Sequence, residues 1–395
     1  NRLNRGFDQT SVSPIDRLID RTKYPGFQQV KGGLLFAGTE GSARNAANTD
    51  WNNIQPRLGA AYLLTDKIVL RGGWGLYFVN PNNDYLQFND IDVKALIDKY
   101  GTPLKLSYLP KIGMQIQRAK GMFAAAMKKH KYEGTYNYCY CTKSSHFSFI
   151  VEEALKHNIH LETSFAYDIE IINKLYQRRR INKETYIICN GYKQKSYTSR
   201  IAKLLNTGFK NVVPVLDNIQ ELQAYKKSVK VPFKLGIRVA AEEEPNFPFY
   251  TSRLGIRARD ILAFYVDEIE GYENKFQLKM LHIFLNKGIK DDVYYWSELN
   301  KLINLYCQLK KICPELDSIN IGGGFPIKHS LGFEYDYQFM INEIVRNIKS
   351  ACKKAKVPEP NIFTEFGSFT VGESMAHIYS VIGQKEQNDR ERSEE

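Results

Sequence analysis

The sequence predicts an α/β protein whose larger part is a closed (β/α)8 TIM barrel, and two observations lead to that prediction. Beyond about residue 88, β-prone runs alternate with amphipathic helical stretches such as SFIVEEALKHN and YWSELNKLINLYCQLKKI. Strands that alternate with helices indicate parallel βαβ units. Eight such runs favour a closed barrel over a doubly wound open sheet, which is the alternative architecture. The runs are 136–142, 159–162, 185–189, 212–215, 233–239, 278–285, 318–321 and 361–365.

The start of the chain differs from the rest in composition. Residues 1–87 contain no cysteine and are rich in asparagine, glycine, arginine and aromatic residues, whereas all six cysteines lie beyond residue 138. No two cysteines form a CxxC pair, which is typical of a reduced, cytosolic domain rather than of a disulfide scaffold. We therefore expect a separate segment at 1–87, a barrel domain at 88–391 and a short tail at 392–395.

The clearest piece of the first segment is PRLGAAYLLTDKIVLRGGWGLYF, residues 56–78. Leu58, Ala60 and Tyr62 alternate on one face of a strand, the Thr65–Lys67 turn follows, and the chain returns with aromatic ends. This pattern predicts a β-hairpin and is typical of a transmembrane β-barrel. A soluble antiparallel hairpin remains the alternative, because an alternation of period two does not separate the two.

The next stretch, DVKALIDKYGTPLKLSYL at 92–109, predicts a short helix, a Gly-Thr-Pro break and a strand over 103–109. The formal net charge of +12 is spread over many helices, and QRRRINK at 177–183 is the one dense basic cluster. A solvated helix end is favoured there over a phosphate-backbone site, so we expect no nucleic-acid partner. No run of 18 apolar residues occurs, which predicts that the chain has no membrane-spanning helix. The cysteine usage predicts that the barrel domain is cytoplasmic.

Lys143 is the first candidate for chemistry. It directly follows the first barrel strand, and active sites of such barrels lie at the carboxyl ends of the strands. A lysine shielded there by apolar and aromatic neighbours can lose its proton and condense with an aldehyde. An isolated lysine at a strand end more often reaches into solvent, so this residue alone decides nothing.

Two further features accompany Lys143. The seventh strand is followed by three glycines, Gly322, Gly323 and Gly324. Without side chains, their backbone N–H groups can approach a phosphate closely. A tight turn is the alternative, but one glycine would suffice for it. Glu365 ends the eighth strand, which neighbours the first in a closed barrel, so it should face the same cavity as Lys143. A carboxylate there can keep a pyridine nitrogen protonated, the alternative being a simple lysine–glutamate ion pair. Together these residues predict a pyridoxal phosphate site.

Several ordered motifs also resemble a known family. YGTPLKLSYL, YCYCTKSSH, GIRVAAEEE, SRLGI, INIGGGFP and TEFGSFTVGES resemble those of the alanine-racemase-type decarboxylases of basic amino acids, most closely the bacterial arginine decarboxylases, over residues 88–391. NNIQPRLGAAYLLTDKIVLRGGWGLYF resembles instead a barrel segment of TonB-dependent, Oar-like outer-membrane receptors. The chain is thus expected to be chimeric, with a receptor-like β-hairpin segment ahead of an alanine-racemase-type barrel.

The decarboxylase resemblance implies a reaction and a set of roles. Lys143 would bind pyridoxal phosphate covalently, Glu365 would contact its pyridine nitrogen, and Gly322–Gly324 would bind its phosphate. Arg238 would line the floor that faces the ring, and Glu162 would lie near the cofactor. The implied reaction converts L-arginine to agmatine and carbon dioxide for polyamine and spermidine biosynthesis in a homo-oligomer; Mg²⁺ is suggested by the resemblance alone. Lysine, ornithine and diaminopimelate remain alternative substrates, and a piece of an outer-membrane receptor remains the alternative to an enzyme.

The resemblance has departures. Phe284 stands where relatives stack a histidine on the cofactor ring, and Lys287 where a phosphate-binding serine would fall; His282, on the same face, is a candidate substitute. Relatives also end in a β-domain that reaches into the partner subunit's site, whereas this chain stops at QKEQNDRERSEE. We therefore expect the strand at 103–109 to be unpaired and turnover to be impaired.

Overall fold

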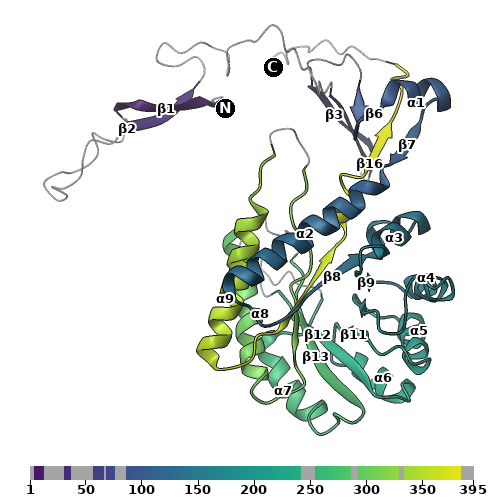
Figure 1. The fold of residues 1–395 in the computed structure, drawn as a ribbon, viewed down its shortest axis with the longest axis vertical. Coiled ribbons are helices and arrows are strands. Elements are labelled where there is room, and N and C mark those ends of the chain that lie inside the picture. The colour runs from purple at the N-terminus through teal and green to yellow at the C-terminus, as the bar shows by residue number, and fades with distance from the viewer. Residues whose placement is uncertain are drawn as a thin grey trace, which may run out of the picture. The chain divides into compact units, whose positions relative to one another are not determined.

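The computed structural model describes residues 4–12, 31–36, 57–65, 68–75, 86–241, 254–285, 292–328 and 333–383 (Figure 1). Contacts divide the chain into two compact units, Asn1–Lys99 and Tyr100–Glu395. The division lies beyond the boundary at residue 87 that the composition suggested. The tail expected at 392–395 lies outside the described residues.

The second unit is a closed barrel of eight parallel strands, in the order β10-β11-β12-β13-β14-β15-β8-β9. Closure is made by β15 and β8, which pair in parallel from Ile362 opposite Tyr136 to Phe366 opposite Tyr140. The predicted (β/α)8 barrel is thereby confirmed, and every predicted strand falls on an observed one. The strands are β8 (Tyr136–Cys141), β9 (His160–Thr163), β10 (Ile187–Cys189), β11 (Val212–Leu216), β12 (Phe233–Arg238), β13 (Phe276–His282), β14 (Ser318–Asn320) and β15 (Asn361–Phe366).

Helices surround the barrel, as Figure 1 shows. A parallel strand is covered on both faces, which is why β11 reads VVPVL and is buried at every position. The helices carry one apolar stripe each: α9 buries Met340, Ile341, Ile344 and Ile348 at helical spacing, and Asp336 caps its start. The helices are α2 (Leu109–His130), α3 (Ser148–Leu155), α4 (Ala166–Gln177), α5 (Lys195–Asn206), α6 (Glu221–Ser228), α7 (Ala258–Glu268), α8 (Asp292–Leu309), α9 (Tyr337–Ala355) and α10 (Ser368–Val371).

The strand predicted at 103–109 is observed as β7 (Leu104–Ser107), but it is not unpaired. It pairs antiparallel with β16 (Met375–Ile378), with Ser107 opposite Met375. After β15 the chain passes through α10 and then forms β16, which runs antiparallel beside β7. Next to this pair, the Tyr108 N–H donates to the Ser374 carbonyl at 2.7 Å. The expectation of an unpaired strand was therefore wrong, because the partner lies only nine residues beyond the last barrel strand.

The described residues of the first unit form mainly short antiparallel pairs. The predicted hairpin is β3 (Arg57–Thr65) with β4 (Ile68–Gly75), and its register sets Leu58 opposite Trp74 and Tyr62 opposite Leu70. The other pairs are β1 (Asn4–Val12) with β2 (Lys31–Phe36) and β5 (Gln87–Phe88) with β6 (Ile91–Asp92), followed by α1 (Val93–Tyr100). Across the described part of the chain, no helix has the length and apolarity needed to span a membrane.

Candidate active site

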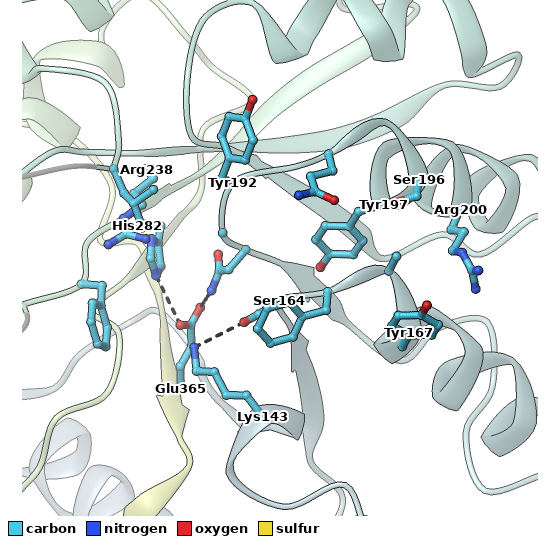
Figure 2. A pocket seen from close by; sticks show the side chains of 17 residues that line it. Lys143, Ser164, Tyr167, Tyr192, Ser196, Tyr197, Arg200, Arg238, His282 and Glu365 are labelled. Atoms are coloured by element: carbon cyan, nitrogen blue, oxygen red, sulfur yellow. Dashed lines mark hydrogen bonds and ion pairs between the residues drawn. The ribbon is translucent and has the colours of Figure 1, made fainter. Parts of the chain in front are cut away.

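The carboxyl ends of the barrel strands surround a pocket of about 640 Å³ (Figure 2). This is a normal size for a site that holds a small molecule or cofactor. One side is formed by residues at the ends of barrel strands, and the other by residues at the starts of α4 and α5. The first group includes Lys143, Asn190, Arg238, His282, Phe284 and Glu365; the second includes Tyr167, Ser196, Tyr197 and Arg200.

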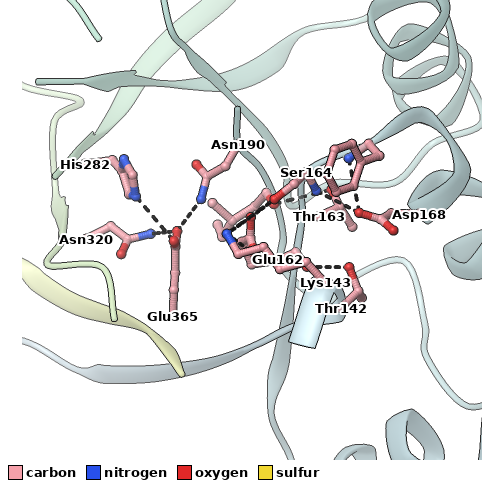
Figure 3. A network of polar contacts seen from close by, with 12 residues as sticks. Thr142, Lys143, Glu162, Thr163, Ser164, Asp168, Asn190, His282, Asn320 and Glu365 are labelled. Carbon is pink, nitrogen blue, oxygen red and sulfur yellow. Dashed lines mark hydrogen bonds and ion pairs between the residues drawn. The ribbon is translucent and has the colours of Figure 1, made fainter. Parts of the chain in front are cut away.

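Lys143 lies in a single 3-10 turn, Thr142–Ser144, that directly follows β8. Its Nζ is 3.5 Å from the Glu162 carboxylate and 3.4 Å from Ser164 Oγ (Figure 3). Burial alone would lower the pKa of Lys143, but the charges of Glu162, Cys141 and Glu365 outweigh it and raise the pKa. The nearby carboxylates thus oppose the loss of the lysine proton that apolar shielding was expected to favour.

Glu162 lies beneath that ammonium and is fully buried. Ser164 Oγ donates to its Oε1 at 2.7 Å, whereas its Oε2 makes no hydrogen bond to any described residue. Burial raises the pKa of Glu162, the nearby charge of Glu365 raises it further, and Lys143 opposes both. The structure thus brings Glu162 to Lys143 as a carboxyl group that can exchange a proton with it.

Glu365 is held by three hydrogen-bond donors that lie at or just after the ends of three other strands (Figure 3). Asn190 Nδ2 and Asn320 Nδ2 donate to its Oε1 at 2.7 and 2.6 Å, and His282 Nε2 lies 3.3 Å from its Oε2. Burial alone would raise the pKa of Glu365, but His282, the charge of Lys143 and the hydrogen bond from the Asn190 amide hold the pKa below its usual range. The carboxylate is therefore ionised although it is buried, and it lines the same pocket as Lys143, as predicted.

Asn190 and Asn320 are the functional residues that sequence reasoning missed. Asn190 directly follows β10, and Asn320 is the last residue of β14. Each is an amide at the end of a buried strand, which is the same signal that singled out Glu365. That signal is weak on its own, because only closure of the barrel brings the ends of β10, β14 and β15 together.

The three glycines after β14 each have a backbone reason. Gly322 and Gly324 adopt φ values of +69° and +89°, which side chains rarely tolerate. A Cβ at Gly323 would lie 2.3 Å from the Glu365 carbonyl oxygen. The view that three glycines exceed what a turn needs is thereby corrected. None of these three described glycines lines the pocket, so their role toward a phosphate stays a prediction.

Arg238 and Phe284 close another side of the pocket. The Arg238 guanidinium lies 5.6 Å from the centre of the Phe284 ring, and Lys143 Nζ lies 5.8 Å from it. Phe284 therefore offers an apolar face between two cations. Lys287, the other departure from the family pattern, lies outside the described residues.

The residues of the pocket fit pyridoxal phosphate. Its aldehyde requires an amine, which Lys143 supplies, and its pyridine nitrogen requires an ionised acceptor, which Glu365 supplies. Phe284 supplies an aromatic face, and two buried acceptors at the site, Glu162 Oε2 and Asn190 Oδ1, make no hydrogen bond among the described residues. No group of three or more potential metal-ligating His, Cys, Asp or Glu side chains occurs within the described ranges.

Two family models match the chain. A model described as the pyridoxal binding domain of pyridoxal-dependent decarboxylases matches residues 115–372, and one described as an outer membrane beta barrel domain matches residues 1–223. In the overlap, the structure has the parallel strands β8 to β11 of the closed barrel, so we assign residues 115–223 to the decarboxylase domain. The earlier part keeps a likeness to an outer-membrane barrel, in agreement with the chimeric chain that the sequence predicted.

The chain is similar to curated arginine decarboxylases. It is 23% identical over 337 residues to biosynthetic arginine decarboxylase 2 of Synechocystis sp., which covers 77% of this chain and 50% of that relative. It is 25% identical over 328 residues to the biosynthetic arginine decarboxylase of Citrifermentans bemidjiense, which covers 77% and 49%. The chain thus spans about half the length of these relatives.

Solved structures share the fold. The biosynthetic arginine decarboxylase SpeA of Campylobacter jejuni aligns with a TM-score of 0.61 at 24% identity, over 72% of this chain and 48% of that one. The lysine decarboxylase of Selenomonas ruminantium aligns with a TM-score of 0.59 at 18% identity, over 78% and 73%. Because their names differ in the amino acid, the fold alone does not select a substrate. The decarboxylase model and the barrel coincide over residues 115–372, and the chain belongs to the pyridoxal-dependent decarboxylases through their pyridoxal binding domain.

Proposed function

We propose that this chain binds pyridoxal phosphate through Lys143 and acts in the decarboxylation of a basic amino acid, L-arginine before others, giving agmatine and carbon dioxide. The observation that carries the proposal is the pairing of Lys143 with an ionised, buried Glu365 in one pocket. The arginine decarboxylases among its relatives support the choice of substrate. Lysine, ornithine and diaminopimelate are the competing substrates.

Pyridoxal phosphate, when bound, supplies a protonated pyridine ring that accepts the electron pair left as carbon dioxide departs. Glu365 serves that chemistry because an ionised carboxylate keeps the proton on the ring nitrogen. Three donors already fix its orientation, so little reorganisation is required when the ring nitrogen reaches it. Gly322–Gly324 remain the proposed phosphate loop, with Arg238 on the floor of the pocket.

Lys143 must lose a proton before its nitrogen can bond to a carbonyl carbon. Glu162 is placed to take that proton, because its carboxylate lies 3.5 Å from Nζ and its own pKa is raised. Ser164 contacts both groups and keeps the carboxylate directed toward the lysine. Phe284 shields one side of the amine from water. We propose that Glu162 acts as this proton acceptor.

We further propose that the barrel domain is a cytoplasmic unit that assembles as a homo-oligomer and has no nucleic-acid partner. In the basic cluster at 177–183, Arg178 and Arg180 each contact Glu152 at 3.0 Å, which supports a solvated helix end. Mg²⁺ is left out of the proposal, because the described residues offer no cluster of three ligands for it.

The test is release of labelled carbon dioxide from carboxyl-labelled arginine, lysine, ornithine and diaminopimelate, with pyridoxal phosphate added. Lys143→Ala is the control, since it removes the amine and leaves the rest of the pocket. We expect release from arginine to be fastest and to be absent in the control. Faster release from another amino acid would overturn the assignment of arginine as the substrate. If a protein that carries the cofactor on Lys143 releases no carbon dioxide from any of the four amino acids, the proposed decarboxylation is overturned.

A further inference from the structure

His282 uses only one of its two ring nitrogens. It is the last residue of β13, and only 1% of its surface is exposed. Its Nε2 lies 3.3 Å from Glu365 Oε2, whereas its Nδ1 is buried and makes no hydrogen bond to any described residue. The imidazole lines the pocket beside Glu365 (Figure 2). The histidine therefore points at the Glu365 carboxylate. The sequence had suggested His282 instead as a substitute for the histidine that relatives stack on the cofactor ring.

The contacts of Glu365 decide which nitrogen carries the proton. An ionised carboxylate only accepts hydrogen bonds, so His282 Nε2 must be the donor. A charged imidazolium would also carry a proton on Nδ1, which would be buried without an acceptor at a substantial energetic cost. Burial lowers the pKa of His282 and the nearby cations lower it further, against the opposing effect of Glu365. The neutral Nε2–H form is the one that the site accommodates.

Charged and titratable groups face this pair from several elements. On the adjacent strand β12, Arg238 is the register partner of His282. The buried carboxyl of Asp217, after β11, is also influenced by His282. Among the described residues, the groups around the pair are Arg238 on β12, Lys143 after β8, Glu162 on β9, Cys139 and Cys141 on β8 and Asp217 after β11. Because Arg238 and Lys143 are both cations, they disfavour a third positive charge on His282.

A count of lone pairs shows what remains for a ligand. A carboxylate offers about four acceptor positions, two on each oxygen. Asn190 and Asn320 occupy Oε1, and His282 occupies one position on Oε2. One acceptor position, on Oε2, is thus left for a donor that enters the pocket. A protonated ring nitrogen has one N–H to donate, which matches it.

We propose that His282 is a positioning residue for Glu365: as a neutral Nε2–H donor it keeps the carboxylate ionised and presents a single acceptor position on Oε2 to the ring nitrogen of the cofactor. The tautomer follows from the chain's own contacts. The effect on the cofactor rests on the proposed function. The two parts are therefore tested separately.

The first test is nitrogen NMR of the protein without cofactor, prepared with ¹⁵N-labelled histidine. His282→Gln assigns the signals by removing one imidazole. We expect the neutral Nε2–H form of His282 to persist from about pH 5.5 to 8, whereas an exposed histidine titrates in that range. An imidazolium, or a proton on Nδ1, would overturn the proposal. This result does not depend on whether the protein binds pyridoxal phosphate.

The second test is the pH dependence of pyridoxal phosphate affinity, measured by absorbance titration. His282→Leu removes the donor, so Glu365 takes up a proton at higher pH, and affinity should fall about tenfold with the loss growing as pH decreases. His282→Gln retains an N–H donor and should recover most of the affinity. Phe284→Leu, which removes an aromatic face, should weaken binding equally at every pH.

An unchanged pH profile in His282→Leu, or the same profile in His282→Gln and His282→Leu, would overturn the positioning role. If the unaltered protein does not bind pyridoxal phosphate, or binds it equally well without the Glu365 carboxylate, the proposed function fails. The NMR measurement then still decides the state of His282. If His282→Leu does not fold, His282→Gln and the unaltered protein supply both readouts.

Discussion

Gly323→Ala should disturb the site through the backbone of Glu365. A Cβ at position 323 would lie 2.3 Å from the Glu365 carbonyl oxygen, inside the 3.0 Å that real Cβ atoms keep. The loop cannot easily withdraw, because the Glu365 N–H donates to the Gly322 carbonyl at 2.9 Å. Nor can β15, since it pairs with β8 on its other side. Overpacking of this kind costs about 1–3 kcal/mol of unfolding free energy.

Gly121→Ala is the matched control. Gly121 lies in the exposed part of α2, and a Cβ there would meet no atom within 4 Å. The same substitution should therefore stabilise the protein by up to about 1 kcal/mol, the helix preference of alanine over glycine. Urea denaturation gives both free energies, and absorbance titration gives the affinity for pyridoxal phosphate. A Gly323→Ala protein as stable as the original, with unchanged affinity, would refute the packing of this loop against Glu365.

Three further outcomes are expected. Lys193→Met removes the ammonium that lies 3.1 Å from the buried Glu221 carboxylate. The unfolding free energy measured in urea should fall by about 3–5 kcal/mol, and a loss below about 1 kcal/mol would contradict this. Glu162 raises the pKa of Lys143, so addition of pyridoxal phosphate should accelerate as pH rises. Glu162→Gln should move that acceleration to lower pH and, because the proposed proton acceptor is lost, should also reduce the maximal rate; identical absorbance-based rate profiles would speak against the contact. Limited proteolysis should remove the unit Asn1–Lys99 and leave the barrel intact, whereas equal resistance of both units would contradict their independence.

The sequence predicted the barrel and the meeting of Lys143 with Glu365, because both follow from periodicity and closure. Eight buried strands alternating with helices leave few architectures, and closure brings the ends of the first and eighth strands together. Residues at those two strand ends must then share a cavity. The hairpin of β3 and β4 was predictable for a similar reason, since its alternation and turn are local.

The remaining features depend on contacts between distant segments. Asn190 and Asn320 reach Glu365 across sequence separations of 175 and 45 residues, which local patterns do not reveal. The ammonium state of Lys143 depends on how closely Glu162 approaches it, which spacing does not fix. The pairing of β7 with β16 joins residues that lie far apart in the sequence, such as Ser107 and Met375. The need for a glycine at position 323 likewise became clear only from the position of the Glu365 carbonyl oxygen.

The central claim is that Lys143 is the residue that binds pyridoxal phosphate. Borohydride reduction in the presence of the cofactor, followed by peptide mapping, tests it directly. Lys193 is a demanding internal control, because its chain neighbours Tyr192 and Gln194 line the pocket and burial lowers the pKa of its ammonium group. The account predicts a pyridoxyl label on Lys143 and its loss in Lys143→Arg. A label on Lys193 or another lysine, or no label on the folded protein, would contradict it.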